Sequence, residues 1–268
     1  MENLDDVDAN AIINEAVKNL YDGIPEKEIS TSLVMTARSL VEKDPNYSFV
    51  TSRLLLDQLR SEALTRLDIA EKATQSEMAE YYPEALEAFI KLGIEKDLID
   101  PTLEQYDMEM LGAALLPERD NQFTYLGLQT LYDRYFLHTE EVRIELPQVF
   151  FMRVAMGLAA QEPDREERAI EFYELLSSFD YMSSTPTLFN AGTLRPQLSS
   201  CYLTTVPDDL MGIYGAIQDN AMLSKWAGGL GNDWTPVRGL GSYIKGTNGK
   251  SQGVVPFLKV VNDTAVAV

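Results

Sequence analysis

Apolar side chains recur at helical spacing over the first 180 residues of the chain. They return every three or four positions, which is the period of a helix with one buried face. Prolines or short polar side chains precede several of these stretches, as is typical of helix starts. The pattern predicts eight helices, over residues 8–22, Pro25 to Val41, Asn46 or Ser48 to Leu59, 77–92, 103–115, 124–136, 147–160 and 164–178. Between the sixth and the seventh, the sequence HTEEVRIEL from His138 predicts a short hairpin.

After the eighth helix the pattern changes. Residues 199–206 form a short β-branched and aromatic run that is typical of a strand. Asp208 and Asp209 are suited to cap a helix over 210–227, and a glycine-rich turn is expected to end it. A last helix is expected over about 254–268. This order begins an α/β architecture with too few strands to close a sheet, so we expect a mainly α region followed by an incomplete α/β region.

The formal net charge of −20 is distributed unevenly. Residues 201–268 contain five Asp, no Glu and five Lys or Arg, so the acidic excess lies in the first 200 residues. Such a surface repels phosphate backbones and anionic lipids, which predicts no nucleic acid and no membrane as partners. The sequence has no long apolar run, its N-terminus is acidic and it contains a single cysteine, so we expect a cytoplasmic protein without a disulfide. It also lacks a cluster of Cys and His residues, so we expect no metal site.

The candidate chemistry lies between Ser183 and Gly253. This segment contains SSTPTLFNAG, then LSSCYL around Cys201, and residues 201–268 hold ten of the sixteen glycines. Glycine-rich backbone lets main-chain N–H groups approach an anion, and a thiol nearby can react with the bound molecule, which favours a nucleotide-processing thiol enzyme. A lone cysteine is also typical of a small buried hydrophobe, and the only histidine, His138, is assigned no role.

The same segment resembles the large catalytic subunit of class I ribonucleotide reductase, and the similarity extends upstream through RIELPQVFFMRVAMGLA from Arg143. The resemblance implies a partial ATP-cone over residues 1–60, a helical domain over 61–180, and the first part of a ten-stranded α/β barrel over 181–268.

The ATP-cone match rests on LYDGIP and RLLL, and the glycine-bearing N-terminal hairpin of that domain is missing. Glu26 and Ser30 stand where nucleotide-binding members can carry a Thr and a His. Both departures weigh against an activity-regulating ATP or dATP site.

In this family a thiyl radical removes the 3′-hydrogen of a ribonucleoside diphosphate, the 2′-hydroxyl leaves as water, and two thiols supply the reducing equivalents. The resemblance implies that Cys201 is one of these two thiols, and that the reaction serves deoxyribonucleotide supply for DNA replication. The radical cysteine and the second thiol would come from a complementary C-terminal half, so we expect the chain alone to be inactive. The resemblance further implies that the chain binds no cofactor directly and that its effector is a nucleoside triphosphate with Mg²⁺. It implies three partners: a second copy in a homodimer, a small diiron subunit that generates the radical, and thioredoxin or glutaredoxin as reductant.

The resemblance also assigns ligand contacts. The residues implied for the substrate are Thr185, Ser200, Gly228 and Gly229, and those for a dNTP or ATP effector are Asp208, Leu210, Arg238 and Ile244. Ordinary structural roles fit them as well: a turn at Thr185, a helix C-cap at the glycines, an N-cap at Asp208 and a surface cation at Arg238. The helix from Leu210 is implied to form the dimer interface.

Two alternatives remain open at this point. The first is a catalytically inactive nucleotide-binding or assembly module that keeps the effector site and the dimer surface. The second is a helical interaction protein with a coincidental cysteine, which requires the long motif match to be accidental.

Overall fold

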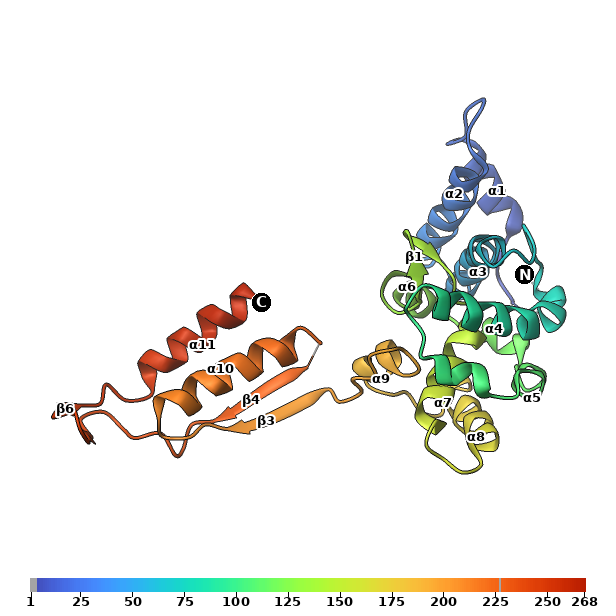
Figure 1. The fold of residues 1–268 in the computed structure, drawn as a ribbon. Helices are drawn as coiled ribbons and strands as arrows, with labels where there is room; N and C mark the ends of the chain where they lie inside the picture. The colour runs from blue at the N-terminus through green and yellow to red at the C-terminus, as the bar shows by residue number, and fades with distance from the viewer. Residues whose placement is uncertain (1–3, 227) are drawn as a thin grey trace. The chain divides into compact units, whose positions relative to one another are not determined.

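The computed structural model describes residues 4–226 and 228–268, which form two compact units (Figure 1). Unit 1 contains the chain up to Ser183 together with Phe189–Pro196, and unit 2 contains Ser184–Leu188 together with Gln197–Val268. Ala227, at which the predicted helix over 210–227 ends, lies outside the described residues.

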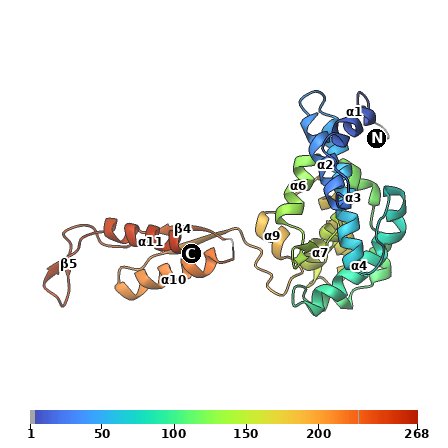
Figure 2. The same ribbon diagram turned by 90° about the horizontal axis from the view of Figure 1, so that it is seen from above.

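Unit 1 is helical, as predicted, and each of the eight predicted segments contains a helix (Figure 2). The α-helices are α1 (Ala9–Val17), α2 (Glu26–Ser39), α3 (Tyr47–Arg66), α4 (Met78–Glu95), α5 (Met108–Ala113), α6 (Tyr125–Arg134), α7 (Pro147–Ala159) and α8 (Arg165–Ser177). Short 3₁₀ helices occupy η1 (Gln75–Glu77), η2 (Pro101–Gln105) and η3 (Pro117–Gln122).

The third helix is longer than predicted, since α3 continues from Leu59 to Arg66. Two other predicted helices are cut short or divided because turn-forming side chains interrupt them. The helix predicted over 8–22 ends at Val17, and the residues that follow, which include Asn19 and Gly23 at φ +82, form turns. The helix predicted over 103–115 is two separate pieces, η2 and α5. The Asp107 carboxylate accepts a hydrogen bond from the Met110 N–H at 2.9 Å and so caps a new helix start in the middle of the predicted one.

The predicted hairpin is present between α6 and α7. Strands β1 (His138–Thr139) and β2 (Val142–Arg143) pair antiparallel, with Thr139 opposite Val142. Glu140 and Glu141 form a two-residue loop with positive φ at both positions, the backbone twist that suits tight hairpins.

Helix α7 lies at the centre of unit 1 and is buried on nearly every side. An α-helix that is apolar all round is typical of a core position. One charged side chain interrupts it: Arg153 is fully buried and forms an ion pair with the equally buried Glu145, with Nε 2.9 Å from Oε1. The same guanidinium donates to the Ala191 carbonyl at 2.9 Å and thereby fixes the segment Phe189–Pro196 to unit 1.

A second buried polar group, Asp120 of η3, connects four elements. Its carboxylate accepts hydrogen bonds from Tyr82 of α4 at 2.8 Å and Gln148 of α7 at 2.7 Å, and it pairs with Arg60 of α3 at 3.3 Å. Burial raises the pKa of Asp120 despite the opposing effect of Arg60. These contacts hold the packing of α3, α4 and α7 in one arrangement.

Unit 2 begins with α9 (Thr185–Asn190), whose last two residues belong to unit 1, and continues as an α/β unit. Strand β3 (Cys201–Thr205), helix α10 (Leu210–Ser224) and strand β4 (Gly229–Asp233) form a parallel βαβ arrangement, followed by the hairpin β5 (Tyr243–Ile244) and β6 (Gly249–Lys250) and by α11 (Val255–Ala267). Helix α10 lies along the β3–β4 pair and packs against α11 (Figure 1).

The prediction of a simple glycine-rich turn after α10 was wrong, because β4 lies there. Its sequence GLGND has few of the β-branched or aromatic side chains that normally signal a strand. Pairing with β3 determines its conformation. The strand predicted over 199–206, the helix starting at Leu210 and the last helix are confirmed.

The core of unit 2 lies between α10 and its neighbours. Val206, Ile213, Ala216, Ile217 and Val237 are buried there, with partly buried Trp234 and Phe257 against them. The other side of α10 stays exposed, since Leu210 is 63% and Tyr214 54% exposed. Apolar residues of this helix therefore divide between a core face and an open face.

Candidate thiol and nucleotide site

Cys201 is the first residue of β3, and its side chain is exposed. Residues at alternate positions of a strand face opposite sides. On β3, Tyr202 and Thr204 are partly buried, whereas Cys201 and Leu203 are exposed, the latter at 90%. The burial of this thiol as a small hydrophobe is therefore excluded, and the sulfur lies on the open face of the sheet.

Strand β4 leaves the side of this sulfur unobstructed. Cys201 pairs in register with Gly229, and Leu203 pairs with Gly231. A methyl group added at Gly229 would lie 3.8 Å from the sulfur and 3.1 Å from the Ser200 carbonyl oxygen. The Gly229 N–H donates to this same carbonyl at 2.6 Å. Backbone without side chains next to a reachable thiol is suited to close approach of a ligand.

Ser200 and Gly228 also have defined neighbours. The Ser200 hydroxyl lies 3.6 Å from the Cys201 sulfur and is oriented to donate to it. Gly228 packs under the ring of Tyr202, where an added methyl group would approach a ring carbon to 2.6 Å. The structure thus brings Ser200 and Gly229 to the Cys201 sulfur, whereas Gly228 lies against Tyr202, whose side chain is on the other face of β3.

Thr185 opens helix α9, so the alternative role of a turn at this position does not apply. Pro186 stands in the first turn of that helix, where its fixed φ and missing N–H are tolerated. The Thr187 hydroxyl of the same helix donates to the Leu198 carbonyl at 3.0 Å. This contact links the start of α9 to the stretch that leads into the thiol strand.

Asp208 and Arg238 bind each other. The Arg238 Nε lies 3.0 and 2.9 Å from the two carboxylate oxygens of Asp208, and the Arg238 backbone N–H donates to Oδ1 at 3.1 Å. Hydrogen bonds from Arg238 lower the pKa of Asp208. Asp209 acts as the N-cap of α10, since its carboxylate accepts the Gly212 N–H at 2.8 Å. Of the two predicted capping residues, Asp209 caps the helix and Asp208 serves the ion pair.

The other two predicted effector residues, Leu210 and Ile244, each lie a few positions after one member of this ion pair in the sequence. Leu210 is the first residue of α10, directly after the Asp209 cap. Ile244 ends β5, and the Arg238 guanidinium donates to the carbonyl of its neighbour Tyr243 at 3.1 Å. A carboxylate, a guanidinium and a glycine-rich hairpin therefore lie in one part of unit 2.

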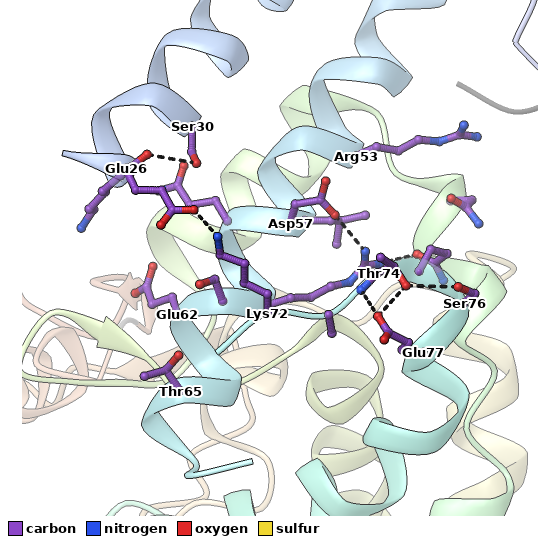
Figure 3. Close-up of a pocket in the computed structure, with 18 of the residues that line it drawn as sticks. Glu26, Ser30, Arg53, Asp57, Glu62, Thr65, Lys72, Thr74, Ser76 and Glu77 are labelled. Carbon is purple, nitrogen blue, oxygen red and sulfur yellow. Dashed lines mark hydrogen bonds and ion pairs between the residues drawn. The ribbon is translucent and has the colours of Figure 1, made fainter. Parts of the chain in front are cut away.

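Unit 1 has a hollow of its own, of about 1340 Å³, between the start of α2, the middle of α3 and the residues before α4 (Figure 3). Glu26 and Ser30, the two residues that were expected to weigh against a nucleotide site, both line it. The Glu26 carboxylate forms an ion pair with Lys72 across the hollow. This pair is largely exposed, and it places a carboxylate beside one of the cations that line the hollow, which also include Lys27, Arg53 and Arg60.

Among the features that sequence reasoning missed are the strand β4, the buried pair Glu145–Arg153, and an amide pair between Asn220 and Asn232. An arginine within the apolar run VFFMRVAM was a usable signal, because an unpaired charge is not stable in a core. Nothing in the local sequence indicated the other two.

In the part of the chain that the structure describes, no three or more His, Cys, Asp or Glu side chains group in a way that would hold a metal ion. The helices among residues 4–226 and 228–268 are too short or too polar for any of them to traverse a lipid bilayer.

A helical unit followed by an open parallel βαβ unit with a surface thiol defines a thiol protein of mixed helical and α/β class. Family models match both parts: "Ribonucleotide reductase, all-alpha domain" over residues 121–196 and "Ribonucleotide reductase, barrel domain" over 199–268. Together the two matches cover more than half of the chain.

Curated relatives extend this similarity to nearly the whole chain. It is 51% identical over 262 residues to ribonucleoside-diphosphate reductase subunit alpha of Chlamydia muridarum, covering 97% of this chain and 24% of the relative. The subunit alpha of Helicobacter pylori is 41% identical, with 100% of this chain and 32% of the relative covered. The large subunit of Danio rerio is 36% identical, with 98% and 32% covered. The chain belongs to the ribonucleotide reductase large-subunit family, and it spans about a quarter to a third of the length of these relatives.

Proposed function

We propose that this chain is the N-terminal part of a ribonucleoside-diphosphate reductase large subunit and reduces ribonucleotides when a complementary C-terminal half completes it. The observation that carries the proposal is the exposed Cys201 sulfur beside the side-chain-free backbone of Gly229, within the region that matches the barrel domain. A thiol with that exposure is accessible both to a sugar and to an external reductant.

The reduction replaces the C2′–O bond of the ribose with a C2′–H bond. The hydroxyl leaves as water, and two thiols are oxidised to one disulfide, which supplies two electrons and two protons. Cys201 provides one of these thiols, and the C-terminal half provides the second thiol and the radical-bearing cysteine. A separate small subunit with a diiron centre generates the radical, and thioredoxin or glutaredoxin reduces the disulfide again.

Around the thiol, we assign Thr185, Ser200 and the backbone of Gly228 and Gly229 to the substrate. The hydroxyls of Thr185 and Ser200 are suited to ribose hydroxyls and diphosphate oxygens. The N–H groups of Gly228 and Gly229 already donate to the Leu223 and Ser200 carbonyls, so these glycines contribute by leaving room for the ligand. The geometry around Cys201 supports this assignment for Ser200 and Gly229, and the contact between Thr187 and Leu198 supports it for the helix that carries Thr185.

The effector site is assigned to Asp208, Leu210, Arg238 and Ile244, with Mg²⁺ bound to the triphosphate of the dNTP or ATP. Because Asp208 and Arg238 bind each other, the nucleotide exchanges their mutual hydrogen bonds for contacts with its sugar hydroxyl and phosphates. The exposed face of α10 serves as the dimer interface beside this site.

We assign residues 1–60 to a partial ATP-cone, 61–180 to the helical domain and 181–268 to the start of the barrel. The ion pair between Glu26 and Lys72 supports the loss of nucleotide binding in the first of these. A cytoplasmic role in deoxyribonucleotide supply for DNA replication completes the proposal.

The experiment supplies the C-terminal half, the radical-generating subunit and a dithiol reductant to the full chain and measures deoxyribonucleotide formation. Cys201→Ser should abolish turnover, because serine cannot form the disulfide. Thr205→Ser, a similarly small change on the same face of β3, is the matched control and should retain it. Equal turnover by wild type and Cys201→Ser would contradict the role of Cys201, and no turnover with the wild-type chain would contradict the proposal and favour an inactive nucleotide-binding or assembly module.

A further inference from the structure

Strand β4 is joined to helix α10 by two side-chain amides. Asn220 of α10 donates from Nδ2 to the Oδ1 of Asn232 at 2.7 Å, and Asn232 of β4 donates from Nδ2 to the Oδ1 of Asn220 at 3.1 Å. Both residues are half-buried. Each amide therefore satisfies the other at the contact between helix and sheet.

The sequence of β4 specifies its pairing register only weakly. A register is normally set by a strong difference between the buried and the exposed side of a strand, and glycine-rich strands lack this difference. In β4 only Leu230 and Asn232 carry side chains on the side of α10, and Leu230 is still 37% exposed. The directional contact on that side is the amide pair.

A shift of β4 by one residue would exchange its two faces. The face beside Cys201 now carries Gly229 and Gly231, without side chains. After a shift, Leu230 would face the same side as the sulfur and cover the backbone approach. A methyl group added at Gly231 would meet the end of the Leu203 side chain at 2.7 Å, but that side chain is 90% exposed and can turn away, so this contact does not exclude the shifted register.

We propose that Asn220 and Asn232 are positioning residues that fix the register of β4 and thereby keep Gly229 beside the Cys201 sulfur. Their importance for catalysis rests on the proposed function, whereas their effect on register does not. The arrangement resembles the use of a buried asparagine to specify register in coiled coils, where specificity is gained at some expense of stability.

The test uses the full chain and compares Asn232→Leu, Asn220→Ala and the double variant Asn220→Leu/Asn232→Leu with wild type. Asn262→Ala, at an exposed position of α11, is the control. Hydrogen exchange of the β3 and β4 amides reports register. The rate at which a chromogenic disulfide modifies Cys201, the only cysteine, reports the surroundings of the sulfur.

Loss of the amide pair should weaken exchange protection of the β4 amides by about fivefold or more, the order expected for one lost hydrogen bond. The rate of Cys201 modification should differ from wild type by about threefold or more, in all three variants and not in the control. The double leucine variant is the sharpest case, because replacing both polar partners by apolar groups can leave the overall stability unchanged.

The inference is overturned if the Asn220→Ala and double leucine variants keep wild-type protection at Gly229 and Gly231 and a wild-type modification rate. Asn220→Ala leaves the sequence of β4 unchanged. If the substitutions at Asn232 unfold β4, Asn220→Ala alone still tests the inference. A positive result stands even if Cys201→Ser retains turnover, and a negative one leaves the reductase proposal untouched.

Discussion

Replacing Arg153 by methionine tests how much the buried ion pair contributes to unit 1. Arg153→Met keeps the length of the side chain, removes the guanidinium and leaves the Glu145 carboxylate buried without its cation. It also removes the donor to the Ala191 carbonyl. Breaking a buried pair by removing one partner costs about 3–5 kcal/mol, since the remaining charge keeps its desolvation penalty.

In a unit of this size such a loss lowers the melting temperature by roughly 6–20 °C. Far-ultraviolet circular dichroism follows the helices, most of which belong to unit 1. Both tryptophans, Trp226 and Trp234, lie in unit 2, so their fluorescence provides an internal reference in the same sample. The circular dichroism transition should move to lower temperature more than the fluorescence transition.

Arg168→Met is the matched control. Arg168 pairs with Asp164 and Glu171, but its side chain is 45% exposed, so its loss should shift the transition by no more than about 3 °C. Glu145→Leu combined with Arg153→Met should recover part of the loss, because no buried charge is then left unpaired. Equal shifts for Arg153→Met and Arg168→Met would refute this reasoning.

Other predictions follow from individual contacts. Arg238→Ala should raise the pKa of Asp208 back toward its ordinary value of 3.8, which a carboxylate NMR titration measures. Because the pKa of Asp208 is lowered in the folded state, the stabilisation from this ion pair is present above pH 3.8. It is lost as the pH falls through the lowered pKa. An unchanged pKa would argue against the ion pair in solution. Gly157→Ala should strongly destabilise unit 1 in thermal unfolding, since the added methyl group would overlap the Gly192 backbone, whereas Gly215→Ala, with open space around it inside α10, should stabilise its helix by about 0.5–1 kcal/mol. The opposite order of the two glycine variants would contradict the described packing.

The helices of unit 1 were predictable because apolar side chains recur along them, as a stripe or all round, and because recognisable residues mark several of their starts. Helix α7 is the clearest case, with Pro147 at its first position and an apolar sequence behind it. The same rules failed for 103–115, where Asp107 begins a new helix within a single apolar pattern.

The candidate site was predictable only in part. Cys201 and the strand that carries it were identified from the sequence, whereas β4 was not, because its pairing with β3 comes from tertiary contacts and not from its glycine-rich sequence. The bond between Asp208 and Arg238 joins residues thirty positions apart, and neither side chain signals the other locally. The assignments of ligand contacts remain predictions that the proposed experiments test.

The interleaved course of the chain between the two units limits how the protein can be divided. Unit 1 needs Phe189–Pro196, which follows the unit 2 segment Ser184–Leu188 in the sequence. A shortened chain that stops at Ser183 would lose the Ala191 carbonyl to which Arg153 donates, and a buried cation would remain with fewer partners. Expression of the helical unit by itself therefore calls for an end point at or beyond Pro196, and a proteolytic cut between residues 183 and 189 would damage both units at once.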